Sequence, residues 1–214
     1  MRVTLEWATP NADKAIMRMA RVSNPEGQNS ERAQLLRYCM EHGHVSPFDM
    51  ANACLEIDTT RDIGRQILRH SSFKFQEFSQ RYADVSLIDE GDMELRECRL
   101  QDSKNRQNSL ETDDTFLIEA WDIKQSLIYN TAKESYQWAL ANGIAKEQAR
   151  ALLPEGLTPS RMYMNGTMRS WIFYLKQRLD MSTQKEHRLI AQAVLTELRT
   201  VAPITMAAFF PEAV

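Results

Sequence analysis

Positive charge and aromatic rings are concentrated in the segment RQILRHSSFKFQEFSQRYAD, which spans residues 65–84. Guanidinium groups bind phosphate through paired hydrogen bonds, and rings or guanidinium planes stack on flat heterocycles. Arg61, Arg65 and Arg69 recur every four residues, so a helix would align them in one row. Most such rows are solvated, salt-bridged helix faces. The neighbouring rings favour a nucleotide-like ligand only slightly over such a surface.

Two further polar clusters could carry chemistry. His42, His44 and Ser46 lie in HGHVSPFD, without the histidine or carboxylate spacing of a metal site, and we predict no metal there. Trp171, Tyr174 and Arg178 recur at helical spacing and would place a guanidinium beside two rings. An aromatic stripe of this kind usually belongs to a core, although a core rarely ends in an unpaired arginine.

Composition limits the class of protein. The 214 residues are 43% hydrophobic and 26% charged, which is typical of a folded domain rather than a disordered chain. The net charge of -3 makes the basic segment a local site on an acidic body, which argues against a nucleic-acid-binding module. The sequence contains no G-x-G-x-x-G, Walker or G-x-S-x-G motif.

Cysteine usage and hydropathy indicate the compartment. Cys39, Cys54 and Cys98 are widely spaced and form no C-x-x-C pair, as expected for reduced thiols. Met1 leads directly into RVTLEWATP, with no apolar run long enough for a signal peptide or a membrane span. We therefore expect a cytoplasmic protein with no membrane partner.

The elements that must position these residues are few strands and many helices. Alternating apolar residues predict strands over 2–8 and 50–60. Residues 71–79 are expected to form an ordered loop, and the polar segment 89–113 a mobile insertion. The pattern predicts an α+β fold, with a small mixed or antiparallel sheet and several long helices in a single domain over 1–214. Helices are predicted over 11–22, 31–43, 61–70, 114–142, 145–154 and 164–180, with a last helix buried along 190–201.

Several helix ends and faces are predicted in more detail. Asn11 is a plausible cap, Thr183 and Glu186 form a T-x-x-E capping box, and Gly143 should end the long helix. The buried face of that long helix is expected to comprise Leu117, Trp121, Ile128, Ala132, Tyr136 and Ala139.

The segment RHSSFKFQEFSQRY resembles the R-H-R-x7-S motif of flavin-dependent thymidylate synthases. Arg69, His70 and Ser79 occupy its fixed positions. Six further segments resemble family segments in the correct order and cover nearly the whole chain, most like the short viral and cyanobacterial members. They are ARVSNP (20–25), HGHVSPFD (42–49), KNRQNS (104–109), ARALLPEG (149–156), MNGTMRSWIFYLKQR (164–178) and TQKEHRLIA (183–191).

The resemblance implies an enzyme that binds FAD, takes electrons from NADPH and transfers a one-carbon unit from methylenetetrahydrofolate to dUMP, giving dTMP. It also implies a homotetramer whose active sites are shared between subunits. No cysteine nucleophile is needed, in agreement with the ordinary cysteines of this chain. Reduced flavin supplies the reducing equivalents, and the protein supplies positioning and electrostatics.

The resemblance also assigns residues. Arg178 would be catalytic, contacting the uracil edge and stabilising the ring when N3 loses its proton. The dUMP pocket would comprise Gln66, Arg69, Glu77, Ser79, Gln80, Arg81, Arg150 and Arg178, with arginines holding the phosphate. The FAD site would comprise Ser23, His44, Ser46, Arg69, His70, Ser71, Glu77, Thr167, Arg169 and Phe173.

Two departures from the family pattern fall on the FAD side. Ser71 replaces the third residue of R-H-R, and Phe173 stands where related chains tend to carry a polar histidine or asparagine. Alternatives to dUMP methylation therefore stay open. One is a related flavin- and folate-dependent change at C5, such as hydroxymethylation or action on dCMP. The other is a non-catalytic nucleotide-binding relative.

Overall fold

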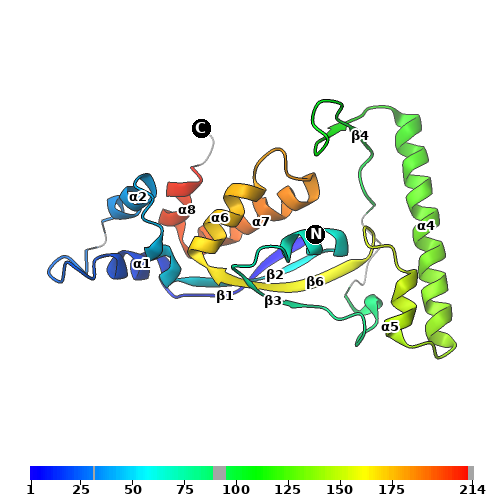
Figure 1. Ribbon diagram of the computed structural model, residues 1–214, viewed down its shortest axis with the longest axis horizontal. Coiled ribbons are helices and arrows are strands. Elements are labelled where there is room, and N and C mark those ends of the chain that lie inside the picture. The colour runs from blue at the N-terminus through cyan, green and yellow to red at the C-terminus, as the bar shows by residue number, and fades with distance from the viewer. Residues whose placement is uncertain (31, 89–94, 212–214) are drawn as a thin grey trace.

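An antiparallel four-stranded sheet runs along the molecule (Figure 1), for which a computed structural model describes residues 1–30, 32–88 and 95–211. The strands β1 (Arg2–Ala8), β2 (Asn52–Thr60), β6 (Pro159–Thr167) and β3 (Lys74–Glu77) lie in the order β1-β2-β6-β3. Strands β2 and β6 pair over nine residues, from Asn52 opposite Thr167 to Thr60 opposite Pro159. This pairing places buried side chains opposite one another, as at Ile57 and Met162.

Helices supply the rest of the main core. It joins the sheet to α1 (Ala12–Ala20), α2 (Gln34–Glu41), α6 (Met168–Arg178), α7 (Lys185–Val201) and α8 (Pro203–Phe209). Trp171 of α6 is fully buried, and its indole Nε1 donates to the Ala53 carbonyl of β2 at 3.2 Å. Ile190, Val194 and Leu198 bury one face of α7, as predicted from their spacing. The α+β class with a small antiparallel sheet is confirmed.

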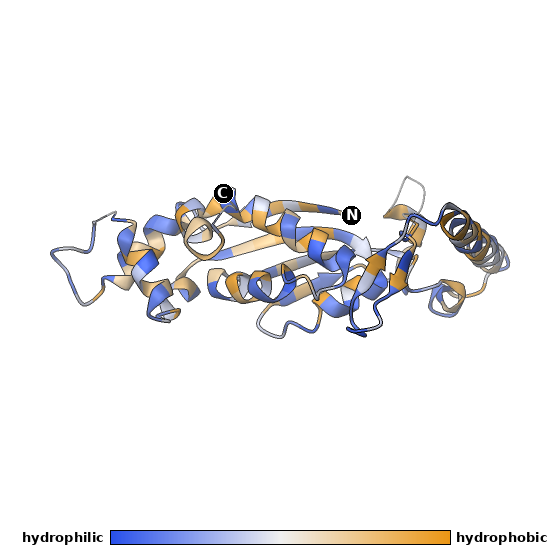
Figure 2. Cartoon of the chain, turned by 90° about the horizontal axis from the view of Figure 1, so that it is seen from above, coloured by the Kyte–Doolittle hydropathy of each residue, from blue (hydrophilic) through white to orange (hydrophobic). Residues whose placement is uncertain are grey.

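The long helix α4 (Thr115–Ala141) stands at one end of the molecule, beyond the sheet, in both ribbon views (Figures 1 and 2). The carboxylate of Asp114 accepts from the Leu117 amide at 3.0 Å, and Gly143 follows the helix with a φ of 75°. A second, small core joins α4 to α5 (Lys146–Ala149) and the 3-10 turn η3 (Arg150–Leu152).

The predicted buried face of α4 is correct only near its C-terminal end. Tyr136 and Ala139 are buried, whereas Leu117, Trp121 and Ile128 are exposed. The reason is that these three side chains line a hollow beside α4 instead of packing into a core. The Trp121 indole donates to the Arg96 carbonyl at 2.8 Å.

Two segments that sequence patterns predicted as helix or loop are strands. Residues 164–167 belong to β6, and α6 begins at Met168, where Thr167 Oγ1 accepts from the Ser170 amide at 3.2 Å. Residues 74–77, predicted as loop, form β3 against β6. Gly166 permits this arrangement, because an added Cβ would lie 2.4 Å from the Phe73 ring.

Of the other predicted helix ends, Asn11 is at the N-cap position of α1 as predicted but makes no side-chain capping bond, and the cap at Thr183 was wrong. Thr183 does not cap α7, because its hydroxyl donates to the Gln177 carbonyl at 3.1 Å. Asn11 takes the left-handed conformation, with a φ of 51°, and its side chain accepts no capping hydrogen bond. The helix α3 (Arg61–Ile67) is shorter than predicted, and α8 was not predicted.

The expected insertion over 89–113 is partly ordered. Residues 89–94 lie outside the described residues. Strands β4 (Arg99–Gln101) and β5 (Ser109–Glu111) form an antiparallel hairpin. Side chains of Arg96 and Arg99 tie this hairpin to the body, so its described part is not a structureless loop.

Candidate functional site

The predicted row of three arginines is broken at the end of α3. Arg61 and Arg65 lie on the helix and both pair with Glu155, whereas Arg69 lies beyond Ile67 and is exposed. Arg61 also lies 3.7 Å from the carboxylate of Glu77, which accepts from the Ser160 hydroxyl at 2.9 Å. Carboxylates thus hold two of the guanidinium groups in place.

A depression lies over the end of α3 and over η3. Three arginines line it, and Gln80 is 4% exposed with an amide nitrogen that has no hydrogen-bond partner among the described residues. Three cations around an unsatisfied donor suit an anion such as phosphate. Its lining residues are Arg61, Arg65, Gln80, Glu147, Arg150, Ala151, Leu153 and Glu155.

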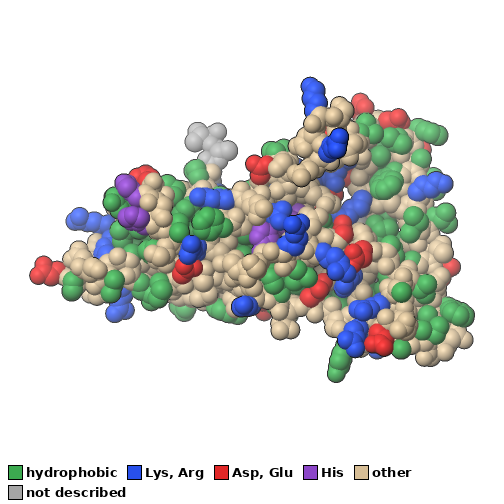
Figure 3. All heavy atoms as spheres, viewed as in Figure 1, with side chains coloured by type: hydrophobic (Ala, Val, Ile, Leu, Met, Phe, Trp, Pro, Cys, Tyr) green, Lys and Arg blue, Asp and Glu red, His purple; other side chains and the backbone are tan. Residues whose placement is uncertain are grey.

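The structure therefore brings together part of the predicted dUMP pocket. Gln80 and Arg150 line the depression, and Arg81 pairs with Glu147 at its rim, 3.3 Å away. Ser79 is exposed on the loop after β3. The space-filling view shows Lys and Arg side chains close to Asp and Glu side chains in this part of the molecule (Figure 3).

Arg178, at the end of α6, contacts His70 directly. Its Nε donates to His70 Nε2 at 3.0 Å, so that ring nitrogen carries a lone pair. Burial, with the charges of Arg178 and Arg69, lowers the pKa of His70 to about 4. His70 is therefore neutral near pH 7 and holds one edge of a charged guanidinium. Within the described part of the chain, no hydrogen bond or ion pair engages the terminal nitrogens of Arg178.

The predicted FAD residues fall into two groups. Ser23, His44 and Ser46 are exposed near α1 and α2, at the end of the molecule opposite α4 (Figure 1). Ser71 is exposed on the turn between α3 and β3.

The second group begins α6. Thr167 and Arg169 share Asp49, whose two carboxylate oxygens lie 2.9 Å from the threonine hydroxyl and 3.0 Å from the guanidinium. The guanidinium of Arg169 lies 5.9 Å from the centre of the half-exposed Phe173 ring. Asp49 belongs to η1 (Ser46–Met50), so this contact connects the HGHVSPFD segment to α6.

These residues suit an anionic, flat cofactor by their chemistry. Arg69, Arg169 and Lys74 offer positive charge, and the Phe173 ring offers an exposed face. Ser23 follows α1, His44 follows α2 and Arg150 follows α5. Figure 1 shows α1 and α2 at the opposite end of the molecule from α5, so one chain alone does not gather the complete predicted set.

Several polar residues near this site were missed by sequence reasoning. Asp49 lies inside HGHVSPFD and His187 inside TQKEHRLIA, where Glu186 was predicted only as part of a helix cap. Arg99 lies outside any recognised segment and was found only because it pairs with Glu186 at 2.5 Å.

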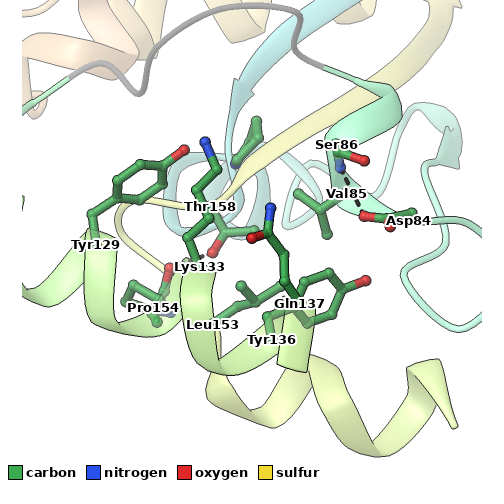
Figure 4. A pocket seen from close by; sticks show the side chains of 12 residues that line it. Asp84, Val85, Ser86, Tyr129, Lys133, Tyr136, Gln137, Leu153, Pro154 and Thr158 are labelled. Carbon is green, nitrogen blue, oxygen red and sulfur yellow. Dashed lines mark hydrogen bonds between the residues drawn. The ribbon is translucent and has the colours of Figure 1, made fainter. Parts of the chain in front are cut away.

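Two other hollows adjoin α4. One lies between α4, the turn at Asp84–Ser86 and residues 153–159, and none of the predicted site residues lines it (Figure 4). A larger one separates α4 from the β4–β5 hairpin and is lined in part by residues 106–109 of the KNRQNS segment and by Gln184. Neither belongs to the arginine depression.

The described residues offer neither a candidate metal site nor a candidate membrane span. No group of three or more His, Cys, Asp and Glu side chains is placed to hold a metal ion among the described residues. No helix in the described ranges is long and apolar enough to cross a membrane.

Comparison with known proteins gives consistent matches. Residues 4–204 match the family described as thymidylate synthase complementing protein (Thy1). The flavin-dependent thymidylate synthase of Synechocystis sp. is 48% identical over 174 residues, covering 81% of this chain and 78% of that protein. The probable flavin-dependent thymidylate synthase of Paramecium bursaria Chlorella virus 1 is 47% identical over 191 residues, covering 85% and 83%.

The fold has a solved counterpart. The crystal structure of the UMP/dUMP methylase PolB from Streptomyces cacaoi, bound with 5-Br dUMP, superposes with a TM-score of 0.79. The two chains are 26% identical, and the match covers 97% of this chain and 93% of the other.

Proposed function

Because this chain belongs to the family of flavin-dependent thymidylate synthases, we propose that it methylates dUMP to dTMP with FAD as its bound cofactor. The family predicted from the motifs is thereby confirmed. The structural observation that carries the proposal is the Arg178–His70 pair, which leaves a charged guanidinium with free donors next to a neutral ring.

The arginine depression is the proposed phosphate site. Arg61, Arg65 and Arg150 line the depression together with Gln80, whose amide nitrogen has no hydrogen-bond partner in the described part of the chain. A phosphate there would receive several charge-assisted hydrogen bonds. The exposed side chains of Arg69, Ser79 and Arg81 would complete the pocket from the rim or from a second subunit. The full proposed dUMP set is Gln66, Arg69, Glu77, Ser79, Gln80, Arg81, Arg150 and Arg178.

Arg178 is the proposed catalytic residue. As the uracil ring gains negative charge on losing the N3 proton, a fixed guanidinium beside it is favoured more in the transition state than in the ground state. His70 fixes that guanidinium by accepting from Nε, which leaves the terminal nitrogens for the ring. A neutral His70 adds no second positive charge that would repel Arg178.

The FAD proposal rests on residues from both groups described above. Thr167 and Arg169, held by Asp49, would bind and orient the cofactor with His70, Glu77 and Phe173. Ser23, His44, Ser46, Arg69 and Ser71 would contribute from their exposed positions. Bound FAD would supply reducing equivalents, and NADPH and methylenetetrahydrofolate are the proposed co-substrates.

We further propose that the protein is a homotetramer that works in the cytoplasm. The outward face of α4 carries large apolar side chains, of which Phe116 is 80% and Trp138 62% exposed. A second copy of the chain would cover such a face and would also bring the two separated groups of predicted residues together. The three cysteines are free thiols, as expected in a reducing compartment.

Complementation tests the proposal. A strain that requires thymidine should grow without it when it expresses this protein, whereas the Arg178→Ala variant at equal expression should not support growth. Absence of growth with soluble, FAD-loaded protein would contradict the proposed reaction.

A further inference from the structure

One carboxylate joins two of the three arginines that line the arginine depression. Glu155 Oε1 accepts a hydrogen bond from Arg65 Nε and lies 3.9 Å from Arg61 Nε. The Arg61 amide donates to the Thr158 carbonyl at 3.0 Å, which fixes the turn carrying Glu155 to the start of α3. Both guanidinium groups therefore lie beside the same, fixed oxygen atom.

Glu155 meets the two arginines at Nε and leaves the terminal nitrogens of Arg65 for a ligand. Within residues 1–30, 32–88 and 95–211, no hydrogen bond or ion pair engages those two nitrogens. The Arg65 side chain is 61% exposed and lines the depression. It can therefore donate from its terminal nitrogens to a phosphate while Nε stays on Glu155.

The two arginines need a shared anion to stay in this arrangement. Arg61 and Arg65 lie one turn apart on α3, and like charges at that spacing repel each other. Without a partner the long, exposed Arg65 side chain would move among many rotamers, and a ligand would have to immobilise it on binding. The shared carboxylate offsets the repulsion and removes that freedom before a ligand arrives.

We propose that Glu155 is a positioning residue that holds Arg61 and Arg65 in place to bind the phosphate of the nucleotide. The proposal rests on the proposed function, in which the depression takes the phosphate of dUMP. Arg65 touches the phosphate, and Glu155 acts only through the arginines. Its own negative charge repels a phosphate, so positioning and repulsion have opposite effects on affinity.

Two uncharged variants separate these effects. Glu155→Gln keeps an oxygen that can accept from Arg65 Nε, whereas Glu155→Met has a side chain of similar length without that acceptor. Both variants remove the repulsion, so the difference between them measures positioning alone. The Glu155 side chain is 47% exposed, so neither substitution opens a cavity in a core.

Calorimetry measures the dissociation constant of dUMP for the FAD-loaded variants. Glu155→Met should bind dUMP about fivefold more weakly than Glu155→Gln, because the freed Arg65 side chain has to be ordered on binding. When Arg65→Met is also present, the two variants should bind dUMP alike, because the side chain that Glu155 holds is gone. Equal affinities with Arg65 present, or the same difference in both backgrounds, would overturn the proposal.

Glu97→Gln and Glu97→Met are the matched controls. The Glu97 side chain is 45% exposed, and its carboxylate pairs with Lys185 at 2.7 Å, away from the residues of the depression. These two variants should bind dUMP alike. A fivefold difference between them would show that the effect is not specific to Glu155 and would overturn the proposal.

Failure of the proposed function would give a different result. If the FAD-loaded wild-type protein bound no dUMP, or if Arg65→Met and Arg150→Met both bound it as tightly as the wild-type protein, the depression would not be the phosphate site. If both arginine variants bound dUMP about tenfold more weakly while the two Glu155 variants bound it alike, only the role of Glu155 would be wrong.

Discussion

The Arg178 guanidinium donates from Nε to His70, and its terminal nitrogens remain available to a ligand. Arg178→Ala should lower turnover on the order of a hundredfold or more, because in the proposed reaction it removes a charged donor beside the ring that gains negative charge. FAD uptake should persist, because the proposed FAD contacts at Thr167 and Arg169 are held separately by Asp49. Steady-state rates and flavin absorbance measure the two effects, and near-normal turnover would refute the catalytic role.

Ser71 and Lys74 offer a test of the altered R-H-R motif. Both side chains are exposed, on the turn before β3 and on β3 itself. An arginine at position 71 would add charge-assisted hydrogen bonds worth roughly 1.5–3 kcal/mol, so Ser71→Arg should tighten FAD about tenfold or more. If Lys74 already supplies that charge, Ser71→Arg should raise FAD affinity only slightly in the wild-type background. It should raise the affinity strongly when Lys74→Ala is also present.

FAD titration of the four proteins in that double-mutant cycle measures the coupling between the two positions. Weaker FAD binding of Ser71→Arg in both backgrounds would mean that the turn has been rebuilt around serine. The third position of the motif would then have been assigned wrongly.

His187 makes stability depend on pH in a calculable direction. Its pKa is about 3 in the folded protein and ordinary in the unfolded chain, so the unfolded state binds more protons between these values. The stability from neutral His187 is present above the unfolded pKa and is lost as pH falls. Between pH 7 and pH 5 the loss from this residue should be about 2 kcal/mol, given an unfolded pKa of about 6.5.

Urea unfolding at the two pH values measures the loss. His187→Asn has no such proton to take up, so it should lose about 2 kcal/mol less than the wild-type protein over the same range. Other groups, His70 included, act in both proteins and cancel. An identical pH dependence of the two proteins would show that His187 is not held neutral.

At the scale of elements, a buried ion pair between Arg99 and Glu186 anchors the β4–β5 hairpin. The side chains of Arg99 and Glu186 are 11% and 7% exposed and lie 2.5 Å apart. Arg99→Met should lower the free energy of unfolding by about 3 kcal/mol, because it leaves the buried Glu186 carboxylate without its nearest cation. Lys185→Met is the matched control. Its partners Glu97 and Glu111 are more exposed, so it should cost below about 1 kcal/mol.

Urea unfolding measures both costs, and hydrogen exchange over residues 95–111 should rise in Arg99→Met alone. Equal costs in the two variants would show that the hairpin is not anchored at Arg99.

The strands β1 and β2 and the long helix α4 follow from local patterns, and the sequence predicts them. Strand β6 shows why local patterns do not predict some other elements. Met162 and Met164 alternate as in a strand, but the apolar residues of MNGTMRSW also suit a helix, and Thr167 decides the boundary by capping α6. Strand β3 depends on pairing with β6, a contact between segments far apart in the sequence that no local pattern contains.

In the candidate site, too, the sequence indicates some residues, whereas the contacts between them become visible only in the fold. The motifs located Arg178, Gln80 and Arg150, because residue types and spacing along the chain are visible in a sequence. The Arg178–His70 and Gln66–His187 contacts join residues more than a hundred positions apart and needed the fold.

At the scale of the whole molecule, that residues 1–214 form one domain remains a prediction, and the separated groups of predicted FAD residues make assembly the main test. The protein should be a tetramer by light scattering and should bind one FAD per chain. Trp138→Glu and Phe116→Glu, on the outward face of α4, should shift it toward smaller species and weaken FAD together. A monomer that bound FAD fully would contradict shared sites.

Product analysis tests the central claim most directly. The FAD-loaded protein is incubated with methylenetetrahydrofolate, NADPH and, in separate reactions, dUMP, UMP or dCMP, and the nucleotides are identified by mass spectrometry. The proposed reaction predicts that dUMP is converted to dTMP only when methylenetetrahydrofolate and NADPH are both present. No dTMP should form with Arg178→Ala. A hydroxymethylated product, conversion of dCMP in place of dUMP, or no conversion by flavin-loaded protein would contradict it.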